Sequence, residues 1–167
     1  VLRMDFETTR TKDSYEKILQ AFASQEADIL IGTQMIVKGH DFPNVTLVGV
    51  LAADMSLHVA DYHAAERTFQ LLTQAVGRAG RGQLPGQAVI QTYDPEHFAI
   101  QTAKAQDYES FYQHEIAYRK MMHYPPIWNM LLVHCMGKNE QITQQTAQLM
   151  ADKLQSAIKR SNRPVLL

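Results

Sequence analysis

The order of apolar and polar residues along the 167-residue chain follows two different periods. Short continuous apolar runs at 28–32 and 45–51 predict strands, 87–92 is a third strand candidate after the turn at 84–86, and the apolar start at 1–4 indicates the end of another strand. Longer segments with apolar residues every three to four positions predict helices, at 13–23, 61–76, 97–104, 108–122 and 141–159. Strands that alternate with helices predict an α/β fold with a parallel sheet.

The predicted strands at 28–32 and 45–51 are continuous apolar runs, which are typical of buried parallel strands. Ligands of such sheets bind in loops beyond the carboxyl ends of the strands. We therefore expect the functional residues in the loops after Ile31 and near Leu51.

The chain is divided at Tyr124-Pro125-Pro126, which breaks any helix. A strand at 127–136 and a helix at 141–159 are predicted after this break. We expect a main α/β domain at 1–105, a helical connector at 106–126, and the incomplete start of a small α/β domain at 127–167.

Composition narrows the classes of function. Apolar residues make up 46% of the chain, enough for a packed core. A net charge of -1 and a pI near 6.7 argue against autonomous, charge-driven binding of nucleic acid. The single cysteine, Cys135, permits neither an intrachain disulfide nor a cysteine zinc cluster and suits a reducing cytoplasm. No membrane span or signal peptide is predicted, and we expect the chain to be a piece of a longer protein.

The most informative residues follow the predicted helix at 61–76. Arg78 and Arg81 stand beside Gly77 and Gly80, and Gln74 lies one turn before them. Arginine offers a planar fork matched to phosphate oxygens, and glycine lets an anion approach the backbone. We expect Arg78 and Arg81 to face nucleotide phosphates that another domain binds. The alternative is a helix cap and a loop, with arginines that are merely favourable at the helix end.

The two faces of the same helix differ. The apolar side comprises Ala65, Phe69, Leu72 and Val76. The polar side comprises Arg67, Gln70, Gln74 and Arg78. The first should pack on the sheet, while Arg67 and Gln70 fit either a ligand face or an ordinary solvated surface.

A second polar segment, 33–43, follows the predicted strand at 28–32. Thr33 and Gln34 could cap a short helix or hydrogen-bond a backbone phosphate, Lys38 carries a point charge, Gly39 permits a tight turn, and Asp41 could accept from a ribose hydroxyl. A bland loop explains this segment equally well on its own; the arginine segment about 40 residues later favours a site. Asp54 and Asp61 are expected to be helix caps, and the seven histidines show no metal-binding spacing, so we expect no metal site.

The segments 33–43 and 74–81 resemble motifs V and VI of superfamily 2 helicases. The string Asp61-Tyr62-His63-Ala64-Ala65-Glu66-Arg67-Thr68-Phe69-Gln70-Leu71-Leu72-Thr73-Gln74 is similar to that of the bacterial primosomal replication-restart helicases within that superfamily. Met121-Met122-His123-Tyr124-Pro125-Pro126 is similar to the way that family enters its C-terminal domain.

The resemblance implies a RecA-like second helicase lobe, a parallel sheet flanked by helices, followed by the start of the C-terminal domain. Arg78 and Arg81 would be arginine fingers, with Gln74 as a γ-phosphate sensor. Gly39, Asp41 and Gly77 would line the nucleotide cleft, and Thr33, Gln34 and Lys38 would contact single-stranded DNA.

The resemblance also implies ATP and Mg²⁺ shared with a first lobe, whose phosphate loop and acidic magnesium motif do not occur in this sequence. Zinc would bind only in the parent protein. The implied partners are single-stranded and forked DNA, primosome proteins and single-strand binding protein, in the bacterial cytoplasm at the nucleoid. The chain by itself should be inactive. The alternatives are a lobe of another superfamily 2 helicase and a non-catalytic α/β docking module.

Overall fold

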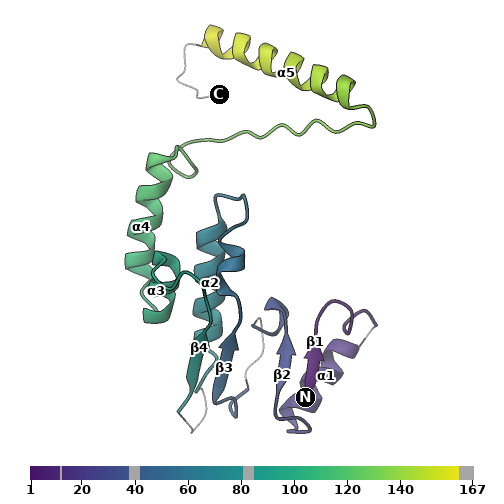
Figure 1. Ribbon diagram of the computed structural model, residues 1–167, viewed down its shortest axis with the longest axis vertical. Helices are drawn as coiled ribbons and strands as arrows, with labels where there is room; N and C mark the ends of the chain where they lie inside the picture. The colour runs from purple at the N-terminus through teal and green to yellow at the C-terminus, as the bar shows by residue number, and fades with distance from the viewer. Residues whose placement is uncertain (12, 38–41, 81–84, 162–167) are drawn as a thin grey trace. The chain divides into compact units, whose positions relative to one another are not determined.

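The computed structural model describes residues 1–11, 13–37, 42–80 and 85–161. It divides into two compact units, Val1–Trp128 and Asn129–Leu167. The first unit holds all four strands of the described residues and most of the helices (Figure 1).

Two parallel strand pairs are built by helical crossovers. β1 (Leu2–Met4) pairs with β2 (Leu30–Gly32), and α1 (Ser14–Ala23) connects them. β3 (Leu47–Val50) pairs with β4 (Gln87–Ile90), and α2 (Ala64–Val76) lies between them in the chain. The α/β class and the parallel pairing are therefore as predicted, although the described strands form two pairs and not one continuous sheet.

The strands are less covered than their apolar runs predict. Exposed and half-buried residues alternate along β3 and β4, and Leu47 in β3 is 60% exposed. Ile31 in β2 is 58% exposed. The expectation of buried strands is wrong for the described chain, because α2 packs against one side of the β3–β4 pair and the other side remains open.

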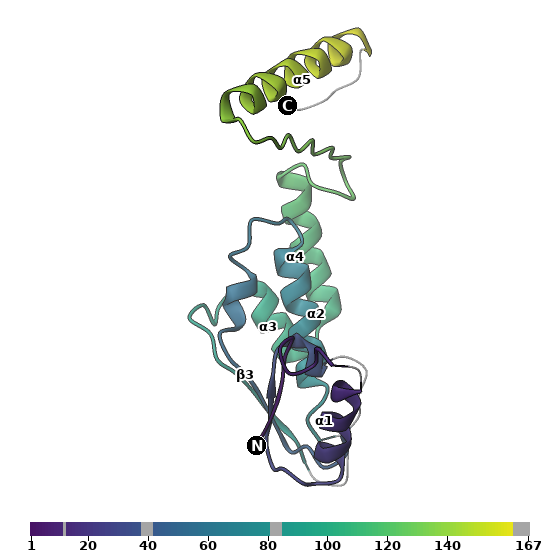
Figure 2. The same ribbon diagram turned by 90° about the vertical axis from the view of Figure 1, so that its right-hand side faces the viewer.

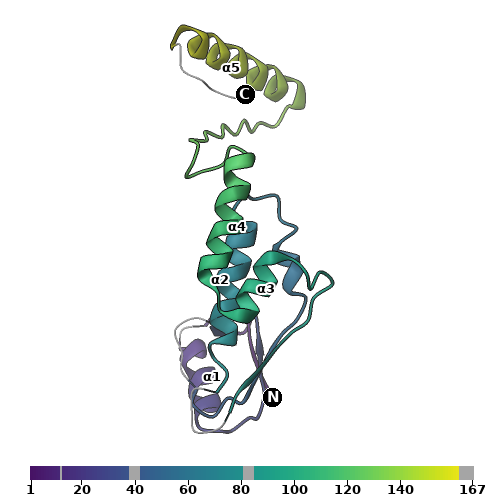
Figure 3. The same cartoon turned by 90° about the vertical axis from the view of Figure 1, so that its left-hand side faces the viewer.

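The core of the first unit is formed mainly by helices. α2 packs against α3 (Phe98–Ala105), and both contact α4 (Tyr108–Met121), so the three helices lie side by side (Figure 2, Figure 3). Phe69 and Phe111 stack at 4.1 Å between ring centroids, and Ala99 and Ala103 are fully buried. These small residues let α3 approach α2 closely, and stacked aromatic rings contribute roughly 0.5–1.5 kcal/mol beyond their burial.

A buried arginine joins the far end of α4 to α2. The Arg119 Nε donates to Glu115 Oε1 at 2.8 Å, and its Nη2 donates to Glu66 Oε2 on α2 at 2.8 Å. Arg119 is 8% exposed and Glu115 is 6% exposed. The charges compensate one another at a place where either alone would be costly.

Two 3₁₀ helices and two helix caps complete the first unit. The 3₁₀ helix η1 (Gln34–Val37) follows β2 and contacts α2. The 3₁₀ helix η2 (Ala53–Ser56) follows β3. α3 begins at a cap in which His97 Nδ1 accepts from the Ala99 N–H at 3.2 Å, and α4 begins at Asp107, whose carboxylate accepts from the Ser110 N–H at 2.9 Å.

The second unit contains α5 (Glu140–Ser161), as predicted, but not the predicted strand at 127–136. That segment has no paired strand among the described residues, and Leu131 and Leu132 are mostly exposed. The prediction was wrong because strand-like composition produces a strand only where a partner accepts the backbone hydrogen bonds. No described helix is both long and apolar enough to cross a membrane.

Replacement of Arg119 by leucine should destabilise the chain by about 3–5 kcal/mol, because it leaves the Glu115 carboxylate buried without its cation. Urea denaturation measures this loss. Arg67→Leu is the control, since Arg67 pairs with Asp61 at the exposed surface and its loss should cost far less. Equal losses in the two variants would contradict a buried role for Arg119.

The cap at His97 should make stability depend on pH. Burial lowers the pKa of His97, whose ordinary value is 6.5, and only the neutral ring can accept from the Ala99 N–H. The unfolded chain therefore binds the proton more readily, so this contribution is complete above pH 6.5 and is lost as the pH falls through the lowered value. His97→Asn keeps a cap that does not titrate. Urea denaturation at about pH 8 and about pH 5 measures the free energy of unfolding. From pH 8 to pH 5, wild type should lose more of it than His97→Asn. Equal losses in the two proteins would refute the role of His97 as a cap.

Candidate functional site

The segment after α2 makes a tight return toward the strands. Gly77 ends the helix and donates to the Thr73 carbonyl at 3.0 Å. Gly80 has φ +73° and donates to the Val45 carbonyl at 3.2 Å. A Cβ on Gly80 would collide with the Gly86 backbone, so only glycine fits there. Gly77 has φ -68° and needs no such freedom.

Arg78 lies inside this return. Its side chain is half-buried, and its Nε is buried without a hydrogen-bond partner among the described residues. An unsatisfied buried donor of a charged group is costly, so a side chain left in this state fits an anion supplied from outside the segment. Thr73 Oγ1, five residues earlier, is buried in the same unsatisfied way.

This site lies at the opposite edge of the strands from the one expected. Gly80 contacts Val45 and Gly86, which directly precede β3 and β4, and the Gln87 N–H donates to the Thr46 carbonyl at 2.8 Å. Arg78 is therefore near the amino ends of the strands. The reason is the crossover itself, because a helix that joins two parallel strands must return from the carboxyl edge to the amino edge.

Thr33 and Gln34 lie where ligand loops were expected, directly after the carboxyl end of β2, and both are exposed. Gln34 begins η1, whose contact with α2 brings this segment to the helix that ends near Arg78. In the described part of the chain, no side-chain contact joins Thr33 or Gln34 to Arg78.

The remaining predicted site residues are distributed as follows. Gln74 is exposed on α2, as are Arg67 and Gln70 on the same polar face. Arg67 donates to Asp61 Oδ2 at 2.6 Å, and Gln70 to Glu66 Oε1 at 3.3 Å, so both belong to an ordinary solvated surface. Four predicted residues lie outside the described residues: Lys38, Gly39, Asp41 and Arg81.

Asp54 and Asp61 are not the helix caps that were expected. Asp54 lies inside η2, is 5% exposed, and accepts from the Tyr93 N–H at 2.9 Å. The Thr92 hydroxyl and then this N–H hold the pKa of Asp54 below its usual range. Asp54 therefore joins the carboxyl ends of β3 and β4. Asp61 accepts from the His63 N–H at 2.9 Å. The N-cap position of α2 is held by His63, two residues after Asp61.

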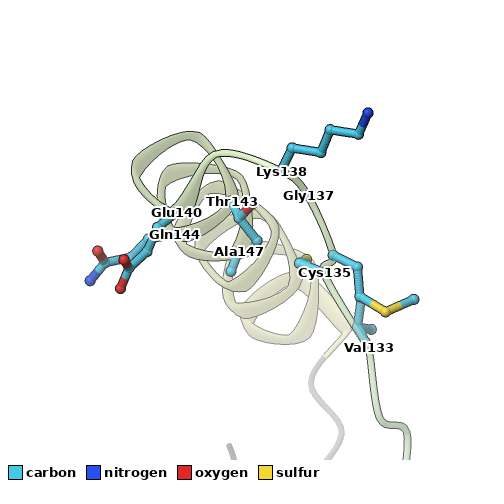
Figure 4. Close-up of a pocket in the computed structure, with 9 residues that line it drawn as sticks. Val133, Cys135, Gly137, Lys138, Glu140, Thr143, Gln144 and Ala147 are labelled. Carbon is cyan, nitrogen blue, oxygen red and sulfur yellow. The ribbon is translucent and has the colours of Figure 1, made fainter.

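The second unit has a separate cavity of about 660 Å³ beside Cys135 (Figure 4). Thr143 and Ala147 of α5 face the segment that carries Cys135. Lys138 points away from the cavity, and Glu140 and Gln144 point to the opposite side. Because the polar groups diverge, this cavity offers no convergent site for chemistry.

No group of three or more histidine, cysteine, aspartate or glutamate side chains within the described ranges is placed to hold a metal ion. The Arg119 cluster is the feature that sequence reasoning missed. The spacing of Glu115 and Arg119 is typical of a helical ion pair, but the bond to Glu66 joins residues 53 positions apart.

Comparison with known proteins agrees with the helicase resemblance of the sequence. Residues 4–83 match the family model of the helicase conserved C-terminal domain. The chain is 59% identical over 133 residues to the replication restart protein PriA of Bacillus subtilis (strain 168), an alignment that covers 80% of this chain and 16% of that protein. It is 49% identical over 150 residues to the replication restart protein PriA of Synechocystis sp. (strain ATCC 27184 / PCC 6803 / Kazusa), covering 90% of this chain and 18% of the relative.

A third relative, the replication restart protein PriA of Chlamydia muridarum (strain MoPn / Nigg), is 47% identical over 149 residues, with 89% of this chain and 20% of the relative covered. The chain thus spans about a sixth to a fifth of the length of these curated relatives. It belongs to the replication restart protein PriA family and contains the helicase C-terminal domain of that family.

Proposed function

We propose that this chain is the C-terminal, RecA-like lobe of an ATP-dependent DNA helicase that recognises stalled forks and restarts replication by primosome assembly. Its two strand–helix–strand crossovers support a RecA-like arrangement. ATP would bind between this lobe and a first lobe that supplies the phosphate loop and the acidic residues for Mg²⁺.

The observation that carries this proposal is the buried Nε of Arg78, which has no hydrogen-bond partner among the described residues. Arg78 lies in a return held by the Gly80–Val45 hydrogen bond. A guanidinium with a donor left unpaired has the charge and the planar donor geometry for a phosphate group. Arg78 is therefore our first candidate for an arginine finger.

In the proposed reaction, closure of the two lobes brings Arg78 and Arg81 to the γ-phosphate of ATP. Their positive charge offsets the negative charge that develops on the transferred phosphoryl oxygens. Gln74, one turn earlier on α2, is exposed and would sense the same phosphate. Gly39, Asp41 and Gly77 would line the nucleotide cleft.

Thr33, Gln34 and Lys38 are the proposed contacts to single-stranded DNA. Thr33 and Gln34 are exposed after β2, and η1 links them to α2. A change in the position of α2 would therefore move η1, which packs against it, and with η1 the proposed DNA contacts. Contacts to the DNA backbone carry little sequence information, so we expect specificity for DNA structure. Primosome proteins and single-strand binding protein are the proposed protein partners, in the bacterial cytoplasm at the nucleoid.

The decisive test replaces Arg78 by alanine in the full-length protein. DNA-stimulated ATP turnover on forked DNA should fall by about a thousand-fold, as for other arginine fingers, while DNA binding is retained. Turnover that stays unchanged would favour the docking module instead. Arg67→Ala is the matched control, since Arg67 lies on the same helix with its charge paired to Asp61, and its turnover should match wild type. The isolated chain should hydrolyse no ATP, and measurable turnover by it would contradict the two-lobe mechanism.

The return that holds Arg78 should tolerate no side chain at position 80. Gly80→Ala forces a residue with a Cβ into positive φ, at about 1–2 kcal/mol, and against the Gly86 backbone. Urea denaturation should show a loss of at least that size. Gly49→Ala is the control, because the space around Gly49 in β3 is open, and its stability should not fall. If both variants are equally stable, the return does not have the strained shape described.

A further inference from the structure

The guanidinium of Arg119 contacts three segments of the first unit. Besides Glu115 on α4 and Glu66 on α2, its Nη1 donates to the Pro125 carbonyl at 3.1 Å. Pro125 belongs to the turn that leaves α4. One planar group with donors on three nitrogens thus fixes a helix pair and the turn beyond it, a geometry that the compact ammonium of lysine does not reproduce.

The turn itself is held at several points. The Tyr124 N–H donates to the Arg119 carbonyl at 2.8 Å, and the Trp128 N–H to the Tyr124 carbonyl at 3.2 Å. The Tyr62 ring, just before α2, lies 5.4 Å from the Arg119 guanidinium carbon and 5.5 Å from the Tyr124 ring centroid. Since Trp128 is the last residue of the first unit, the chain is attached to α2 and α4 up to the point where that unit ends.

The same helix leads to the proposed catalytic residue. Glu66 lies in the first turn of α2, and Arg78 stands two residues beyond the helix end. The 13 residues of α2 span about 20 Å, and a packed helix of that length moves as one body. A shift of α2 at one end is therefore expressed at the other end.

We infer that Glu66 and Arg119 form a mechanical link that couples the ATP site to the turn at Tyr124–Pro126 and to the chain beyond Trp128. Both are positioning residues, because they act through α2 and do not reach the nucleotide. This inference rests on the proposed function, in which α2 responds to ATP through Arg78. A buried ion pair is weak evidence for stability alone, and here its hydrogen bonds join α2 and α4 to the turn that leaves α4.

The test uses Glu66→Ala in the full-length protein, because alanine removes the oxygen that accepts from Arg119 Nη2. Glu66 is a better target than Arg119, because its side chain is 35% exposed and its loss leaves the buried Arg119–Glu115 pair intact. ATP turnover and base pairs unwound are measured together on forked DNA. We expect ATP turnover within about twofold of wild type and roughly a five- to tenfold fall in base pairs unwound per ATP hydrolysed, the lower part of the roughly 5- to 150-fold range of coupling between sites.

Asp61→Ala is the matched control, since it also removes one carboxylate near the start of α2, but Asp61 contacts Arg67 and not α4. The number of base pairs that it unwinds per ATP hydrolysed should match that of wild type. Thermal unfolding should give the same midpoint temperature for both variants. Loss of ATP turnover and unwinding in parallel, or no change in either, would overturn the inference. The proposed function is judged separately by Arg78→Ala, so the link can fail while the arginine finger stands.

Discussion

The packing of α2 against α3 and α4 is the interaction on which the rest of the first unit depends. β3 and β4 form a pair of four-residue strands, and an isolated two-stranded sheet is marginally stable in water. Phe69, Leu72 and Ala75 of α2 are buried, and Phe111 of α4 completes the stack on Phe69. Without that apolar contact, neither the β3–β4 pair nor the turn at Gly80 would have packed helices to hold it in place.

Polar contacts then close the two ends of the β3–β4 pair. At the amino end, the Gly80 N–H reaches the Val45 carbonyl; at the carboxyl end, Asp54 accepts from the Tyr93 N–H. Backbone groups at strand ends need partners when they are removed from water. These bonds provide them, and they hold the segment that carries Arg78 in one shape before any ligand is present.

The ion pairs of the first unit that are discussed above lie either at the surface or in the interior. Arg67 and Asp61 pair at the surface, where solvent screens them. Arg119 and Glu115 pair in the interior, where each requires the other. Arg78 belongs to neither kind, since its Nε is buried without a partner in the described residues. That difference is what separates a proposed ligand-binding arginine from the structural ones, although all three share the same side chain.

The sequence by itself determined the local structure, because helical spacing and turn chemistry act over a few residues. The helices at 14–23, 64–76, 98–105, 108–121 and 140–161 lie within a few residues of their predicted positions. The motifs at 33–43 and 74–81 likewise sufficed for the helicase resemblance. Only tertiary structure decided what depends on distant partners: the open side of the β3–β4 pair, the missing strand at 127–136, and the place of Arg78 at the amino edge. The bond from Arg119 to Glu66 crosses 53 positions, and no periodicity records such a contact, because packing of whole helices brings the two side chains together.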